Sequence, residues 1–234
     1  MKNIRKWQKR LLIAVLALLL LCVGGFILYV SDYYHAEASA LAVLDEDGVS
    51  INEDVIRLDP ISESDTAIIF YPGAKVEAVS YLPLLDQLRM EGYTCFLVSM
   101  PFNMAIFDSN AAADVIADHP DVEHWYIAGH SMGGGMASSF ASKHPDAVDG
   151  LILLGAYIYG DYPDTDALTI YGSFNESVGE HIDYTENIVV IPGGNHAQFG
   201  NYGPQKGDPP ATISAKQQQA ESVDAITNFI KSRA

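Results

Sequence analysis

The stretch AGHSMGGG, residues 128–135, contains the pattern Gly-x-Ser-x-Gly around Ser131. Apolar residues 125–128 predict a buried strand before it, and a helix is predicted to begin at once and to run from Met132 to about Lys143. This strand–turn–helix arrangement is that of a nucleophile elbow, which presents a serine hydroxyl at the carboxyl end of a sheet. So tight a turn needs glycine at 129 and 133. It also accounts for glycines that cost a helix about 1 kcal/mol each.

Predicted strands and helices alternate on both sides of this turn. Such alternation is typical of an α/β fold, a doubly wound and mostly parallel sheet with helices on both faces. The segment 49–58 predicts one or two edge strands. The further strands are expected at 66–71, 93–98, 151–154, 168–171 and 188–191, and the further helices at 79–90, 111–117 and 213–231.

The N-terminal residues are expected to lie outside this domain. Residues 11–30 (LLIAVLALLLLCVGGFILYV) carry no charge, and a helix of that length spans about 30 Å, the thickness of a bilayer core. Five basic residues lie in the first ten positions, and such clusters stay cytoplasmic. We therefore expect a cytoplasmic segment at 1–10, a transmembrane anchor at 11–30, a tether at 31–48 and an extracytoplasmic domain at 49–234. A cleaved signal peptide, cut near Ala36, Ala38 or Ala40, is the alternative.

The charge of the chain excludes several classes of protein. The net charge is −17, and from residue 31 onward eight basic residues face thirty acidic ones. So acidic a domain is not attracted to phosphate backbones, which argues against a nucleic-acid partner. Two cysteines exclude a disulfide-stapled scaffold. The seven histidines are scattered without metal-ligand spacing, so we expect neither a metal nor a cofactor.

Three stretches make the chain similar to the alpha/beta hydrolase family. They are FYPGAKV (70–76), the elbow itself and GGNHAQFGNYG (193–203), and the resemblance covers residues 66–231. The chain looks closest to the small, capless branch that includes dienelactone-hydrolase-like proteins and bacterial esterases. About a dozen residues separate Leu154 from Leu168, where larger members of the family insert a cap. We therefore expect an open, shallow site.

The resemblance implies roles for individual residues. Ser131 is the expected nucleophile, and the base is expected to be His196, which follows the last predicted strand in a loop opened by two glycines. His181 competes for this role but lies in a polar helical stretch before that strand. The oxyanion hole is expected to use the backbone N–H groups of Met132 and, by similarity to the family's His-Gly-x loop, Ala74.

The acid of the triad is left open by the sequence. The family pattern after the penultimate strand resembles Gly-Ser-x-Asp, whereas residues 172–176 read GSFNE, with Asn175 where aspartate is expected. Glu176 can supply a carboxylate from one position later, and Asp161 can supply one from the preceding loop. In the third alternative Asn175 only orients the histidine and the enzyme is slow.

These observations predict a membrane-anchored, extracytoplasmic serine hydrolase that cleaves small carboxylic esters, lactones or thioesters through an acyl-enzyme. Its expected partners are a small-molecule ester and, through residues 11–30, the membrane. Asn175 motivates one alternative, a catalytically weakened hydrolase fold that serves as a binding module. The shallow site motivates another, an acyltransferase, because it admits acceptors other than water.

Overall fold

The computed structural model describes residues 6–233. The chain divides after Tyr33 into an N-terminal unit and a larger unit that begins at Tyr34. The larger unit thus starts earlier than the boundary expected at residue 49. Of the predicted basic cluster, Lys2 and Arg5 lie outside the described residues.

The N-terminal unit contains one long helix, α1 (Lys6–Ser31). The helix is long and apolar enough to cross a membrane, a property that it shares with signal sequences. None of its residues is buried within the protein, and leucine, isoleucine and valine side chains lie exposed along it. Apolar side chains on every face of a helix are typical of a segment whose surroundings are lipid.

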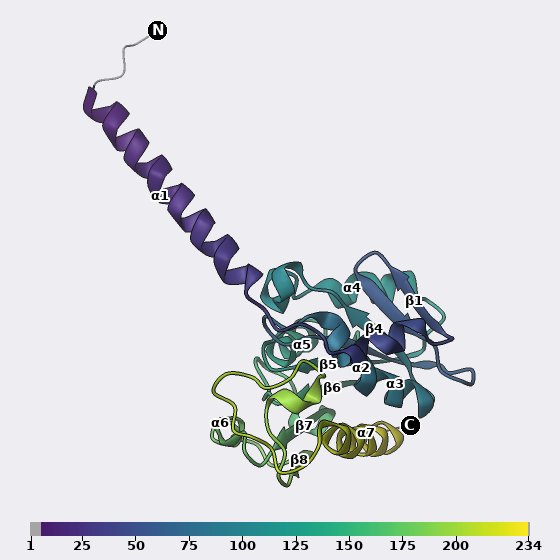
Figure 1. Ribbon diagram of the computed structural model, residues 1–234. Helices are drawn as coiled ribbons and strands as arrows, with labels where there is room; N and C mark the ends of the chain where they lie inside the picture. Colours follow the sequence, from purple (N-terminus) through teal and green to yellow (C-terminus); the bar gives the residue numbers. More distant parts are fainter. Residues whose placement is uncertain (1–5, 234) are drawn as a thin grey trace. The chain divides into compact units, whose positions relative to one another are not determined.

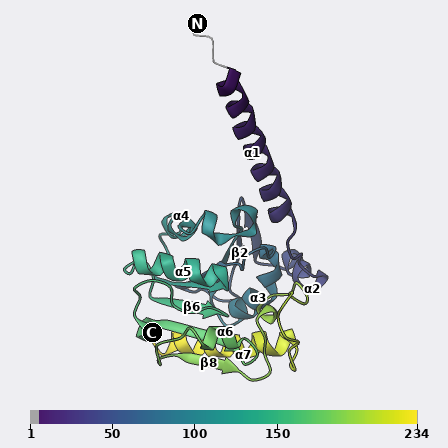
Figure 2. The same cartoon turned by 90° about the vertical axis from the view of Figure 1, so that its left-hand side faces the viewer.

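The larger unit is built on one eight-stranded sheet (Figures 1 and 2) with the order β1-β2-β4-β3-β5-β6-β7-β8. β1 and β2 pair antiparallel with each other, β2 pairs antiparallel with β4, and all other neighbours are parallel. The predicted doubly wound, mostly parallel sheet is therefore confirmed. The strands are β1 (Val49–Asn52), β2 (Val55–Leu58), β3 (Thr66–Tyr71), β4 (Thr94–Val98), β5 (His124–His130), β6 (Gly150–Leu154), β7 (Ala167–Gly172) and β8 (Ile188–Ile191).

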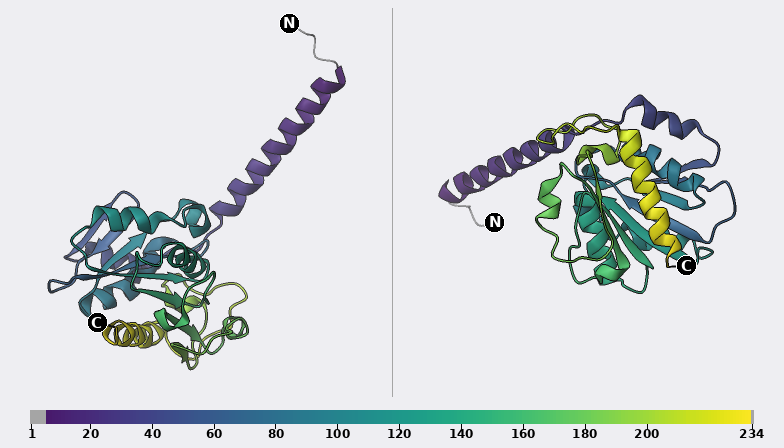
Figure 3. Two further views of the ribbon diagram at one scale, coloured as in Figure 1. Left: turned by 180° about the vertical axis from the view of Figure 1, so that it is seen from behind. Right: turned by 90° about the horizontal axis from the view of Figure 1, so that it is seen from below.

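Helices cover both faces of the sheet because successive strand residues point to opposite sides. Along β3, Ile68 and Phe70 pack in a core with α3 (Leu82–Met90) and α7 (Ala215–Lys231). Ala67 and Ile69 belong to a second core with α4 (Ala111–Asp118) and α5 (Met132–Lys143). Figure 3 shows α7, in yellow, lying alongside the sheet. A short helix, α6 (Glu176–Gly179), follows β7.

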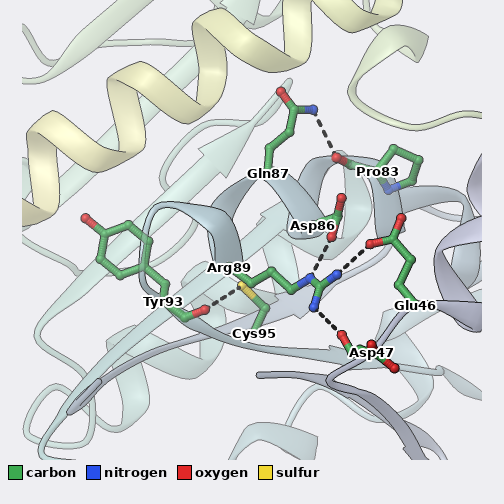
Figure 4. Close-up of polar contacts among 8 residues, drawn as sticks. All are labelled: Glu46, Asp47, Pro83, Asp86, Gln87, Arg89, Tyr93 and Cys95. Carbon is green, nitrogen blue, oxygen red and sulfur yellow. Dashed lines mark hydrogen bonds and ion pairs between the residues drawn. The ribbon is translucent and has the colours of Figure 1, made fainter. Parts of the chain in front are cut away.

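The segment before β1, which was expected to be a tether, packs on the larger unit. It contains α2 (Ala38–Leu41) and a 3₁₀ turn, η1 (Ala42–Asp45), and Ala40 and Val43 are buried. Arg89 of α3 fastens its end (Figure 4): the guanidinium contacts the carboxylates of Asp86 and Glu46 at 2.6 Å each and donates to the carbonyl oxygen of Asp47.

Arg89→Met is expected to destabilise the larger unit by about 2 kcal/mol. The Arg89 side chain is only 8% exposed, and its removal leaves the half-buried carboxylate of Asp86 and the more exposed acceptors of Glu46 and Asp47 without their donor. The measurement is thermal unfolding of the detergent-solubilised chain. Arg57→Met is the matched control, because the Arg57–Asp59 pair is about 40% exposed and such pairs contribute about 0–1 kcal/mol. Equal losses in the two variants would contradict this role of Arg89.

Candidate active site

Ser131 occupies a strained turn between β5 and α5. Its backbone angles are φ 53° and ψ −121°, a region that non-glycine residues adopt only when the surroundings enforce it. A Cβ added to Gly129 would lie 2.5 Å from the backbone of Gly133, and one added to Gly133 would overlap the carbonyl oxygens of Tyr71 and Pro72. The predicted crowding within the turn is therefore confirmed for Gly129, whereas Gly133 must be glycine because the end of β3 approaches it closely.

His196 lies at the same edge of the sheet, in the loop after β8. It immediately precedes a 3₁₀ turn, η6 (Ala197–Phe199). Gln218 of α7 is fully buried and holds the loop by accepting from the backbone N–H of Asn195 and donating to its carbonyl oxygen. Asp208 accepts from the backbone N–H groups of His196 (3.1 Å) and Ala197 (2.8 Å). Four hydrogen bonds from the side chains of Gln218 and Asp208 therefore fix the backbone around His196.

The structure places Asn175, rather than a carboxylate, against the imidazole of His196. The Asn175 Nδ2 atom lies 2.7 Å from His196 Nδ1, and the Asn175 side chain is buried. Glu176 is exposed at the start of α6, and Asp161 is exposed in the loop after β6. Within residues 6–233, neither of these two carboxylates forms a hydrogen bond with His196.

The direction of the Asn175–His196 hydrogen bond determines which nitrogen of the ring carries the proton. With Nδ2 toward the ring, the amide donates to Nδ1, and the neutral ring keeps its proton on Nε2. With the amide turned, Oδ1 accepts from Nδ1–H and leaves Nε2 free to take a proton from a serine. Ser177 Oγ, which donates to Asn175 Oδ1 at 3.1 Å, serves either orientation because a hydroxyl both donates and accepts.

Asp208 is the carboxylate that acts on the charge of His196. Burial lowers the pKa of His196 below its ordinary value of 6.5, because the charged ring loses its hydration, and the negative charge of Asp208 opposes this by raising that pKa. Asp208 therefore acts on His196 in two ways: its negative charge raises the pKa of the ring, and its carboxylate accepts a hydrogen bond from the backbone N–H. The site contains a carboxylate near the histidine, although it does not bond to the ring.

The backbone N–H groups of Met132 and Ala74, expected in the oxyanion hole, form no hydrogen bond within residues 6–233, and of these two residues only Met132 lines the cleft. In the loop after β3, Tyr81 Oη accepts from the N–H of Gly73 and the carbonyl oxygen of Asn103 accepts from the N–H of Lys75. The N–H of Ala74 lies between them in the sequence and has no acceptor in the described part of the chain. Nor has the N–H of Met132, the first residue of α5. Free amides at these two positions are those expected of an oxyanion hole.

An open cleft of about 720 Å³ lies over Ser131 and His196. The connection from β6 to β7 runs from 155 to 166 and contains only one 3₁₀ turn, so the expected absence of a cap is confirmed for this connection. Charged side chains that line the cleft are those of Glu176, Lys206 and Asp208. Much of the remaining wall consists of methionine side chains and aromatic rings: Met132, Met136, Tyr157, Tyr159, Phe174 and His181.

Two residues of the site escaped the sequence analysis. Asp208 lies twelve positions after His196 in a loop of glycines and amides, and no spacing rule points to it. Gly155 follows β6 with φ 55°, and a Cβ there would lie 3.0 Å from His196 Nδ1. A glycine directly after a predicted buried strand was a usable signal for this close approach.

One group of side chains within residues 6–233 has the spacing of metal ligands. Asp65, Glu123 and His124 bring their ligand atoms within 4.8 Å of one another. All three are exposed and lie at the amino ends of β3 and β5, the edge opposite to Ser131. Exposed acidic groups of this kind are common without a metal, so the cluster adds nothing to the chemistry of the cleft.

Comparisons with known proteins agree with this fold. A model of the alpha/beta hydrolase family matches residues 67–220. A protein of Mycobacterium phage D29, named as a non-heme haloperoxidase, is 30% identical over 98 residues. The match covers 38% of this chain and 35% of that protein, so the chain spans about a third of this curated relative.

Two solved structures are similar over most of the chain. A hormone-sensitive lipase from a metagenome library has a TM-score of 0.55 at 14% identity, covering 84% of this chain and 92% of that one. Est1E from Butyrivibrio proteoclasticus has a TM-score of 0.54 at 16% identity, covering 80% and 97%. At these identities the likeness concerns the fold.

Proposed function

Because the chain belongs to the alpha/beta hydrolase family, we propose that it is a serine hydrolase that cleaves small carboxylic esters, lactones or thioesters. The observation that carries this proposal is Ser131 in a strained elbow at the edge of the sheet where His196 also lies. A strained backbone at a polar residue in a cleft is a feature of functional sites. The lipase named among the similar structures fits the same reaction class.

The reaction follows from the groups at the cleft. With the Asn175 amide turned so that Oδ1 accepts from Nδ1–H, His196 Nε2 is free to take the proton of Ser131 Oγ. The serine oxygen then attacks the carbonyl carbon, and the N–H groups of Met132 and Ala74 stabilise the oxyanion. The tetrahedral intermediate collapses to an acyl-enzyme when His196 returns the proton to the departing alkoxide or thiolate. Water then attacks the acyl carbon by the same steps, which releases the acid and restores Ser131.

The form of the cleft supports small substrates. The short β6–β7 connection leaves the cleft open, and a space of about 720 Å³ over Ser131 is within the range of sites for small molecules. The acidic surface of the domain disfavours negatively charged polymers.

We further propose that the N-terminal helix anchors the domain to a membrane. α1 has the length and apolarity of a span, and the basic cluster in the first ten residues, at its N-terminal end, would direct the N-terminus to the cytoplasm and the domain to the outer face of a bacterial cell. Cleavage after α1, which would release a secreted enzyme, is the alternative. The strongly acidic domain would remain soluble beside an anionic membrane surface rather than bind to it.

One labelling experiment tests both the chemistry and the topology. Spheroplasts of a bacterial host that express the full chain are treated with a membrane-impermeant fluorophosphonate, and the adduct is mapped by mass spectrometry. We expect modification of Ser131 on intact spheroplasts. If Ser131 is labelled only after the spheroplasts are lysed, the proposed topology is wrong but the proposed serine hydrolase chemistry is supported. A chain that takes no label in detergent and cleaves no activated ester would overturn the hydrolase proposal.

Asn175 favours a second candidate function, a hydrolase fold that binds ligands and turns them over slowly. An amide stabilises an imidazolium less well than a carboxylate does, and a comparable change in a serine protease lowers turnover about 10⁴-fold. A slow deacylation in an open cleft also suits acyl transfer to an acceptor other than water. Partition of a labelled acyl group between water and added alcohols distinguishes these outcomes.

The pH dependence of kcat/KM is expected to reflect His196. The base acts only when neutral, and burial lowers its pKa, so the acidic limb of the profile should lie below pH 6.5. Asp208 raises that pKa, so Asp208→Asn should move the limb further toward acid. Initial rates with 4-nitrophenyl acetate between about pH 4 and 8 provide the test. A wild-type limb above pH 6.5, or an alkaline shift in Asp208→Asn, would contradict these assignments.

A further inference from the structure

A chain of hydrogen bonds connects the loop after β3 with the backbone of His196. The N–H of Gly73 donates to Tyr81 Oη at 3.1 Å, and Tyr81 Oη lies 2.7 Å from His130 Nδ1. His130 Nε2 lies 3.0 Å from the carbonyl oxygen of His196. Two side chains therefore span the distance between the loop that holds Ala74 and the residue proposed as the base.

The donors and acceptors of this chain fit together in one sense. The carbonyl oxygen of His196 only accepts, so His130 carries its proton on Nε2. Nδ1 of the neutral ring is then an acceptor, and the hydroxyl of Tyr81 must donate to it. The oxygen of Tyr81 in turn accepts from the N–H of Gly73. A protonated His130 would donate from Nδ1, so the Tyr81 hydroxyl would have to turn its own proton away from the ring and lose its acceptor.

The surroundings keep His130 neutral and in place. Tyr81 is fully buried and His130 is 1% exposed. Burial lowers the pKa of His130 well below 6.5, and the neighbouring charge of His196 lowers it further. The ring packs against the rings of His196 (4.6 Å between centroids) and Phe199 (5.6 Å). The hydrogen-bond pattern therefore persists while His196 titrates.

We propose that Tyr81 and His130 form a bridge that positions the oxyanion loop relative to His196. The inference rests on the proposed function and adds two positioning residues to it. The loops after β3 and β8 come from strands that are not neighbours in the sheet, so pairing between strands does not fix their separation directly. Gly73 is adjacent to Ala74, and the other end of the bridge is the carbonyl of the base itself. A Cβ on Gly73 would lie 2.8 Å from atoms of both bridge side chains, so the loop can approach the bridge this closely only because residue 73 is glycine.

Three variants of the full chain in detergent interrupt the bridge at different bonds. Tyr81→Phe removes the shared hydroxyl. His130→Gln keeps a donor for the carbonyl of His196 but loses the acceptor for Tyr81, and His130→Asn keeps that acceptor but loses the donor. With turnover expressed per fluorophosphonate-titrated site, we expect kcat to fall about 10- to 100-fold in each, because misplacement of about 1 Å costs up to 10²-fold. KM should stay within about twofold.

A double variant and a matched control separate positioning from general stability. Tyr81→Phe and His130→Gln break the same bond, so the double variant should fall no more than about twofold below Tyr81→Phe alone. Tyr71→Phe is the control: Tyr71 is also a buried tyrosine of the sheet region, and its hydroxyl accepts from Ala112 N–H and donates to the Ser109 carbonyl, away from the cleft. It should lower the unfolding temperature but leave kcat per site unchanged.

The outcomes distinguish the bridge from the proposed function. A wild-type chain that fluorophosphonate does not acylate overturns the proposed function. If the wild type is acylated and turns over esters while the bridge variants keep full kcat per site, the bridge alone is overturned. Multiplicative losses in the double variant would also overturn it, because they would show that Tyr81 and His130 act independently.

Discussion

Ser131→Ala is expected to abolish fluorophosphonate labelling and to lower kcat toward small esters about 10²-fold. Alanine has no atom that can be acylated, so the loss of label is complete. The moderate size of the kinetic loss follows from non-additivity. In a serine protease the loss of all three triad residues costs about 10⁶ in kcat, and an amide in place of the acid alone already costs about 10⁴. Because Asn175 lies at Nδ1 of His196, the kcat of the wild-type chain is expected to be about 10⁴-fold below that of an enzyme with a complete triad. Only about 10²-fold of the total then remains to be lost with Ser131.

The measurement is the initial rate per mole of folded chain, with the unfolding temperature as the check on integrity. Ser138→Ala is a suitable comparison in the same helix, because its buried hydroxyl bonds the backbone of Tyr159 rather than any group at His196. That variant should keep its label. Persistent labelling of Ser131→Ala, or an unchanged kcat, would show that another residue is the nucleophile.

The sequence predicted the sheet well because its central strands are buried on both faces. Residues 66–71, 132–143 and 188–191 were predicted with the bounds that the structure has. Long apolar runs between glycine and proline leave few alternatives, and the elbow glycines carried their own steric reason. The segment 34–48 was harder. It packs through Ala40, Val43 and the Arg89 contacts, which join residues distant in sequence, so no local pattern reveals them.

The sequence could predict that Ser131 and His196 lie together, because that depends on the order of elements along the chain. Ser131 and His196 follow the strands at which this fold places a nucleophile and a base, and the structure brings both to one cleft. The contacts of Asn175 and Asp208 were not predictable, because they depend on where side chains from different loops meet. Glu176 is one position from Asn175, yet the turn before α6 buries Asn175 and exposes Glu176. A difference of one residue at such a turn changes the direction of the side chain.

Asn175→Asp is expected to raise kcat by up to about 10⁴-fold. The structure supplies the reason: the group at His196 Nδ1 is an amide whose donor faces the ring, an arrangement that leaves the proton on Nε2, where the base must be free. A carboxylate has no donor to present, so it selects the Nδ1–H form in every orientation. Its negative charge also stabilises the imidazolium that forms during acyl transfer.

The same substitution should move the pH profile in a defined direction. A carboxylate at 2.7 Å stabilises the charged ring, so the pKa of His196 rises and the acidic limb of kcat/KM shifts toward higher pH. Asn52→Asp adds the same charge on β1, at the far end of the sheet, and should change neither kcat nor the limb. A rise in kcat without the alkaline shift would mean that the new group acts on something other than His196.

Glu176→Gln completes the test, because it asks whether the exposed carboxylate serves as the acid after all. If Glu176 reaches His196 during turnover, Glu176→Gln lowers kcat by orders of magnitude and Asn175→Asp adds little. If Asn175 is the direct partner of the ring, Asn175→Asp has the large effect, and Ser131→Ala in that background then costs about 10⁶ rather than about 10². The change in the cost of losing Ser131 is the sharper measurement, because it shows that the added carboxylate and the nucleophile work as one unit.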